Sequence, residues 1–125
     1  MAQMTSVSVN IQTASSKMRT AVEIGQSAID SFMQSPWDSI QSSPAEGFME
    51  EKGNVAPATS RLPKAAGDSV IVDGTVYYRF WHVVPDPEIQ NLKTITVWCF
   101  WKGEGSAWRH TTLVTQLADV DYSSE

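Results

Sequence analysis

The clearest hydrophobic pattern covers residues 16–34, where apolar or small side chains recur in steps of three and four. Such steps place these side chains on one stripe of an α-helix, opposite a polar side. The stripe consists of Met18, Ala21, Val22, Gly25, Ala28, Ile29, Phe32 and Met33. Ser15 or Ser16 can cap the start, and Pro36 disfavours helical backbone in the residue before it. The pattern therefore predicts an amphipathic helix over residues 15–35.

Residues 1–14 carry two competing patterns. Val7, Val9 and Ile11 alternate, as they would in a short strand. Helical spacing also fits a second set, which consists of Val7, Ile11, Ala14 and Met18. We interpret residues 1–14 as the truncated start of a longer helix, or as residues foreign to the natural protein.

Residues 36–68 are rich in Pro, Ser, Ala and Gly and show no sustained period. This composition predicts an irregular loop between the helix and the strands. Loops of this length are uncommon in compact domains unless they pack specifically. Large apolar side chains such as Trp37, Ile40 and Phe48 indicate that the loop packs back on the core.

From residue 69 to residue 118 the pattern changes to that of β-strands. Asp73-Gly74 lies between two β-branched runs and predicts a tight hairpin, because Asp-Gly tolerates the positive φ angles of a two-residue turn. Two more strands are predicted over residues 92–101 and 107–117.

Together these elements predict one domain with an α+β fold. One long N-terminal amphipathic helix would pack on an antiparallel sheet of three to four strands, over residues 69–118. Residues 119–125 would form a frayed acidic tail. The length of 125 residues and the 42% content of hydrophobic residues suffice for a single core.

Composition and charge exclude some classes of partner. The net charge is −5, and the 9 basic residues are scattered along the chain. Binding to a phosphate backbone needs clustered Lys and Arg, so nucleic acid is not an expected partner. No segment of the sequence approaches the roughly 20 consecutive apolar residues that span a bilayer.

Residues capable of chemistry are few. Phosphate-binding glycine loops and the HExxH zinc motif do not occur in the sequence. His82 and His110 lie on different predicted strands, and no carboxylate spacing marks a third metal ligand. Cys99 is interpreted as a small buried hydrophobe whose aromatic neighbours raise its pKa. We expect no catalytic residues, no metal site and no cofactor, and hence a protein that is not an enzyme.

Four of the 5 tryptophans lie on predicted strands. They are Trp81, Trp98, Trp101 and Trp108. Side chains alternate across a strand, so one face of the sheet cannot bury all of them. We expect Trp81, Trp98 and Trp108 to be the exposed ones. They would form an interaction or sugar-stacking surface, or the loop at 36–68 would cover them.

Two passages resemble PilV-like minor type IV pilins. The first, AVEIGQSAIDSFMQSPWDSI, resembles their Ala-rich amphipathic helix followed by a short Pro-Trp segment. The second, LKTITVWCFWKGEGSAWRHTTLVTQLA, resembles their closing hairpin, with a Gly-bearing turn and a Thr/Leu-rich final strand. Together they cover about 45 of the 125 residues.

The resemblance implies the soluble head of a minor pilin, with a pilin-like fold and a role in pilus assembly, cell adhesion and twitching motility. The implied partners are other minor pilins, the major pilin and a tip adhesin, with attachment to the inner membrane through a missing N-terminal helix. The implied location is the inner membrane and periplasm before assembly, and the extracellular pilus tip afterwards. The implied subunit contacts on the helix are Val7, Ile11, Ala14, Met18, Val22 and Ile29.

This sequence departs from the pilin pattern in two respects. Residues 1–125 contain neither a leader peptide nor the hydrophobic helix half of a prepilin, and a single cysteine cannot form a C-terminal disulfide loop. Two alternatives remain open. One is the minor pseudopilin I of a type II secretion system, and the other is a cytosolic Trp-rich domain that binds a small ligand or a sugar.

Overall fold

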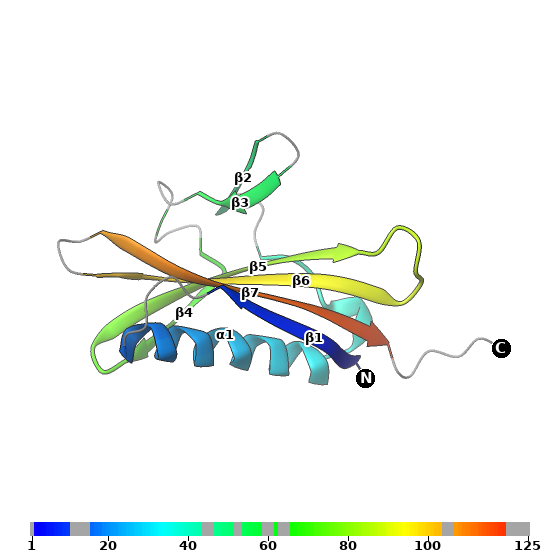
Figure 1. Cartoon of the computed structure of the whole chain (residues 1–125), viewed down its shortest axis with the longest axis horizontal. Coiled ribbons are helices and arrows are strands. Elements are labelled where there is room, and N and C mark those ends of the chain that lie inside the picture. The colour runs from blue at the N-terminus through cyan, green and yellow to red at the C-terminus, as the bar shows by residue number, and fades with distance from the viewer. Residues whose placement is uncertain are drawn as a thin grey trace.

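The computed structural model describes residues 2–10, 16–43, 47–51, 54–58, 62, 66–103 and 107–119. Its middle layer is a five-stranded antiparallel sheet with the strand order β1-β7-β6-β5-β4. These strands are β1 (Ala2–Asn10), β4 (Asp68–Val72), β5 (Thr75–Pro85), β6 (Leu92–Lys102) and β7 (Trp108–Asp119). Helix α1 (Ser16–Gln34) lies on one face, and the hairpin of β2 (Phe48–Glu51) and β3 (Asn54–Pro57) lies over the other (Figure 1).

The predicted fold class was wrong, and so was the pilin-like layout that the resemblance implies, because strand β1 precedes the helix and joins the sheet. Instead of one helix on a sheet of three to four strands, the described chain is mostly β, with five strands in one sheet and two in another. The additional strand of the main sheet is β1, which comes from residues assigned to the start of a long helix. It pairs along its own length with the second part of β7, from Ala2 opposite Asp119 to Asn10 opposite Thr112.

Strand pairing explains why residues 2–10 are extended. The edge of β7 offers unpaired backbone N–H and C=O groups, and pairing with β1 satisfies them. Val7 lies opposite Thr115 and Val9 opposite Leu113. The strand that the alternation of Val7 and Val9 suggests was therefore correct, and the interpretation of these residues as the start of a longer helix was wrong. Ile11 and Ala14 lie outside the described residues.

The segment 36–68 is more regular than predicted. A short 3-10 helix, η1 (Trp37–Ser39), follows α1 directly, and the hairpin β2–β3 forms further along the segment. Phe48 of β2 lies on the outer face of the main sheet, with its ring centroid 5.8 Å from those of Phe80 and Trp98. The expectation that this segment packs back on the core is confirmed, since Ile40 is only 2% exposed.

The remaining strands follow one another as a meander. Asp73 and Gly74 both have positive φ angles, 50° and 78°, and they join β4 to β5 as the Asp-Gly pair predicts. Strands β6 and β7 pair over their full length, from Leu92 opposite Ala118 to Lys102 opposite Trp108. The predicted tail beyond residue 119 lies outside the described residues.

The main core lies between α1 and the sheet. Helix α1 contacts β7, β6 and β1, and alternate residues of β6 point towards it. Two clusters fill this layer. The first contains Ala28, Ile29, Ile40, Ile95, Val97, Leu113 and Leu117. The second contains Met18, Ala21, Ile24, Tyr77, Cys99 and Trp101.

Candidate functional site

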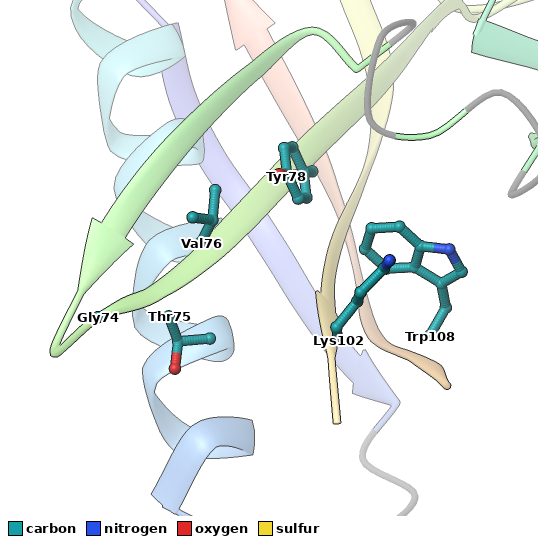
Figure 2. Close-up of a pocket in the computed structure, with 6 residues that line it drawn as sticks. All are labelled: Gly74, Thr75, Val76, Tyr78, Lys102 and Trp108. Atoms are coloured by element: carbon teal, nitrogen blue, oxygen red, sulfur yellow. The ribbon is translucent and has the colours of Figure 1, made fainter. Parts of the chain in front are cut away.

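A groove opens on the outer face of the sheet at the end where β4 turns into β5. Its volume is about 300 Å³, and we call it the Tyr78 groove (Figure 2). Its lining residues are Gly74, Thr75, Val76, Tyr78, Lys102 and Trp108. They come from the β4–β5 turn, the start of β5, the end of β6 and the start of β7, and the antiparallel register brings these strand ends side by side.

The strand periodicity explains which side chains face this groove. Val76, Tyr78 and Phe80 alternate along β5 with residues that face the helix. Lys102 lies opposite Trp108 in the β6–β7 pair, so both side chains share the outer face. The β4–β5 turn at Asp73-Gly74 leaves the end of the groove open, because a Cβ atom on Gly74 would meet no atom within 4 Å.

The polar and aromatic groups of the Tyr78 groove are arranged around Trp108. The Tyr78 and Trp108 rings pack edge to face, with centroids 5.7 Å apart and an interplanar angle of 76°. The ammonium of Lys102 lies 5.2 Å from the centroid of the Trp108 ring, and Figure 2 shows the two side chains next to each other. This cation–π contact holds a positive charge beside an aromatic surface.

An aromatic row continues from this groove across the outer face. Phe100 stacks on His110 at 4.9 Å and packs edge to face on Phe80 at 5.7 Å. Phe48 then covers Phe80 and approaches His82 at 5.6 Å. Phe80 is fully buried and Phe100 is 4% exposed, so this part of the row is a second core beneath the β2–β3 hairpin.

A second groove, of about 310 Å³, lies at the opposite end of β5, and we call it the Trp37 groove. Its lining residues are Trp37, Pro85, Asp86, Ile89, Gln90, Asn91, Leu92 and Lys93. Lys93 holds η1 against β6, because its ammonium donates to the carbonyl of Trp37 at 2.7 Å and lies 4.5 Å from the Trp37 ring centroid.

The turn beside the Trp37 groove is ordered by Asp86. Its carboxylate accepts hydrogen bonds from the backbone N–H groups of Glu88 and Ile89, each at 2.8 Å. These bonds lower the pKa of Asp86 below its ordinary value, because they favour the charged form. The turn presents Ile89 to solvent, with 57% of its surface exposed.

The three tryptophans expected to be exposed are all partly buried, and they lie in different places. Trp81 faces the helix layer, where it packs against Phe32 and donates its indole N–H to the carbonyl of Gln41 at 3.0 Å. Trp98 lies under Phe48 of the β2–β3 hairpin. Trp108 lines the Tyr78 groove.

The helix residues that the resemblance implies as subunit contacts also differ in how deeply they are buried. Met18 is 4% exposed and Ile29 is fully buried, so both belong to the core of this chain. Val22 is half-buried and packs against the first core cluster. Their positions on the helix–sheet interface leave Met18 and Ile29 no surface for another subunit.

The groups considered for catalysis are held apart or buried. Burial raises the pKa of Cys99 to about 12, so its thiol stays protonated at neutral pH. His82 lies on β5 opposite Thr96, while His110 lies on β7 opposite Phe100, with β6 between them. Among the described residues, no group of three or more His, Cys, Asp or Glu side chains is arranged to hold a metal ion.

Sequence reasoning missed Tyr78, Lys102 and Thr75 as members of a site. For Tyr78 and Lys102, the alternation of side chains along a strand predicts the face of the sheet on which each lies. Tyr78 has the same parity on β5 as Phe80, and Lys102 has the same parity on β6 as Phe100 and Trp98. The approach of Lys102 to Trp108 depends on the register of β6 against β7, which the spacing of residues within one strand does not determine.

Within the described residues, no helix has the length and apolar character needed to cross a membrane. Comparison of the chain with protein-family models, with curated proteins and with solved structures finds no match.

Proposed function

We propose that this chain is a non-catalytic minor pilin subunit that helps initiate or modify a type IV pilus by binding other minor pilins. The proposal rests on the resemblance of residues 21–40 and 92–118 to PilV-like minor pilins. Its partners would be those subunits, the major pilin and a tip adhesin. It would reside in the inner membrane and periplasm before assembly and in the pilus afterwards.

A contact between the two passages supports this proposal. The two passages that resemble minor pilins are far apart in the chain, yet Lys93 of the second passage contacts Trp37 of the first. The ammonium of Lys93 also donates to the carbonyl of Ile40, at 3.3 Å. The Pro-Trp segment and the start of the closing hairpin thus form one structural unit, as is expected if both belong to a single functional surface.

The same end of the molecule offers an apolar surface for a protein partner. Ile89 and Val84 are 57% and 43% exposed, and Ile89 lines the Trp37 groove. Large exposed apolar side chains beside a groove are typical of protein interaction sites. We therefore place the contact with other minor pilins at the Trp37 groove.

Co-purification with co-encoded minor pilins tests the proposal. Wild-type chain should retain at least one of them, and Ile89→Asp should weaken that binding about tenfold or more, because it places a charge in an apolar contact. Ile71→Asp is the matched control, since Ile71 is 69% exposed at the other end of the sheet. Failure of the wild-type chain to bind any co-encoded pilin would contradict the proposal. Equal losses from the two variants would contradict its placement at the Trp37 groove.

The related minor pseudopilin I of type II secretion is distinguished by complementation. A strain that lacks the gene should lose twitching motility and recover it when the gene is restored. Loss and recovery of protein secretion instead would assign the chain to the secretion machine. A Gly-Phe cleavage site and an apolar helix encoded upstream of residue 1 would be expected in either case.

A further inference from the structure

We propose that the Tyr78 groove binds a carboxylate-bearing sugar ring, such as a uronic acid unit of a polysaccharide. This inference goes beyond the proposed subunit role and does not depend on it. It rests on the aromatic pair, the lysine ammonium and the tyrosine hydroxyl that meet in one groove of about 300 Å³.

The aromatic pair supplies the apolar part of such a site. Sugar rings have an apolar C–H surface, and Tyr and Trp side chains combine an apolar body with a polar tip. Tyr78 and Trp108 are both half-buried, so their rings are anchored in the sheet and still accessible. The edge-to-face packing of Tyr78 on Trp108 fixes the two rings at an angle of 76°.

The size of the groove restricts the ligand. A volume of about 300 Å³ lies at the lower end of the range for small-molecule sites, so one small ring fits better than an extended cofactor. The groove is open at the β4–β5 turn, where Gly74 leaves free space. A sugar unit within a longer chain could therefore enter while its neighbours remain in solvent.

The charge of the groove selects an acidic sugar. Among the described residues that line the groove, Lys102 is the only charged one, in a chain whose net charge is −5. Its ammonium is kept beside the Trp108 ring by the 5.2 Å contact, so a carboxylate on a stacked ring would meet it. A neutral sugar would offer this cation no opposite charge. Phosphate sites usually combine several donors, such as Arg forks or helix N-termini, and the lining residues contain neither.

One hydroxyl group completes the polar contacts. Tyr78 carries a hydroxyl that can donate a hydrogen bond to a sugar hydroxyl or accept one from it, whereas Thr75 has the strand parity of residues that face the helix. Because Lys102 is exposed and the groove is shallow, water competes with every contact. We expect weak binding, roughly millimolar for a single ring, that would strengthen when several copies act together.

An NMR titration that follows the tryptophan indole N–H signals tests the proposal. The probes are methyl glucuronide, its neutral counterpart methyl glucoside, and N-acetylglutamate amide, which carries a carboxylate without a ring. Methyl glucuronide should shift the Trp108 signal, which is identified by its loss in Trp108→Phe. Methyl glucoside should bind up to about fivefold more weakly, the factor that one exposed ion pair can supply. N-acetylglutamate amide should leave the signal in place.

Lys102→Gln provides the decisive variant. It should reduce the affinity for methyl glucuronide to that for methyl glucoside while leaving the latter unchanged. Lys17→Gln is the matched control, because Lys17 is an exposed lysine on α1, in the other layer of the fold. It should have no effect on either sugar.

Four results would overturn the proposal. The first is no shift of the Trp108 signal with methyl glucuronide, and the second is equal binding of the two sugars by the wild-type chain. Binding of N-acetylglutamate amide at least as tight as that of the glucuronide would assign the groove to acidic peptides instead. An equal loss in Lys102→Gln and Lys17→Gln would show that only the net charge of the protein matters.

Discussion

Replacement of Asp68 by alanine tests how the Arg79 guanidinium joins edge strand β4 and helix α1 to the rest of the sheet. Nε and Nη2 of Arg79 donate to the Asp68 carboxylate at 2.7 and 2.5 Å. Nη1 of Arg79 donates to the carbonyl of Ile24 in the helix at 3.1 Å. Asp68→Ala removes the carboxylate and leaves a cation that is only 15% exposed with one neutral acceptor.

The expected magnitude follows from these contacts. Each charge-assisted hydrogen bond contributes roughly 1.5–3 kcal/mol when shielded from water. Asp68 is 39% exposed, so solvent screening reduces the sum, and we expect Asp68→Ala to cost about 2 kcal/mol of unfolding free energy. Arg79→Met should cost less, about 1 kcal/mol, because the exposed Asp68 can then be hydrated and methionine keeps the apolar stem.

Urea unfolding at neutral pH, followed by tryptophan fluorescence and far-UV circular dichroism, measures both costs. The double variant Asp68→Ala/Arg79→Met should resemble Arg79→Met alone, since no buried cation then remains without its partner. If Arg79→Met costs as much as Asp68→Ala, or if the two costs add in the double variant, an unpaired buried cation is not the cause of the lost stability. The slope of free energy against urea should not change in any of the three proteins.

Four further residues give predictions for the core and the outer face. Phe48→Ala should lower the unfolding free energy by about 2 kcal/mol in urea, because Phe48 covers the outer aromatic row; an effect near zero would show that the β2–β3 hairpin does not seal this face. Burial lowers the pKa of His110 below its ordinary value of 6.5. As the pH falls through 6.5, His110 therefore binds a proton more readily in the unfolded chain than in the folded one, and the unfolding free energy should decrease. His110→Phe should remove this part of the pH dependence in urea midpoints measured below neutral pH. Thr111→Val should raise the unfolding free energy by about 1 kcal/mol, since the buried Thr111 hydroxyl has no hydrogen-bond partner among the described residues; a loss would reveal a bond to that hydroxyl. The thiol of Cys99 should react with Ellman's reagent only after denaturation, and rapid reaction of the native protein would contradict its burial.

Several local elements could be predicted because short-range patterns specify them. The step of three and four in residues 16–34 predicts the helix, and the structure places α1 at Ser16–Gln34. Asp73-Gly74 predicts the turn, since few residue pairs adopt two successive positive φ angles. The alternation in β6 predicts that Ile95 and Val97 share a face, and both are fully buried.

The fold class could not be read from these patterns, because it depends on pairing between distant segments. β1 forms through its register with β7, more than 100 residues away, and nine residues of alternation do not reveal that partner. The β2–β3 hairpin lies in a segment whose composition is that of a loop. Its position over the sheet follows from Phe48, which packs on three aromatic rings supplied by strands β5 and β6.

The sequence by itself determined the helix, the β4–β7 meander and the excess of aromatic residues on the strands. Only the tertiary structure decided that Trp98 is covered, that Trp81 joins the helix layer and that Trp108 lines a groove beside Lys102. The physical reason is that the side-chain period of a strand assigns residues to two faces, whereas exposure depends on what covers each face. Helix α1 covers one face and Phe48 covers part of the other. Neither contact can be predicted from the sequence of the strand that it covers.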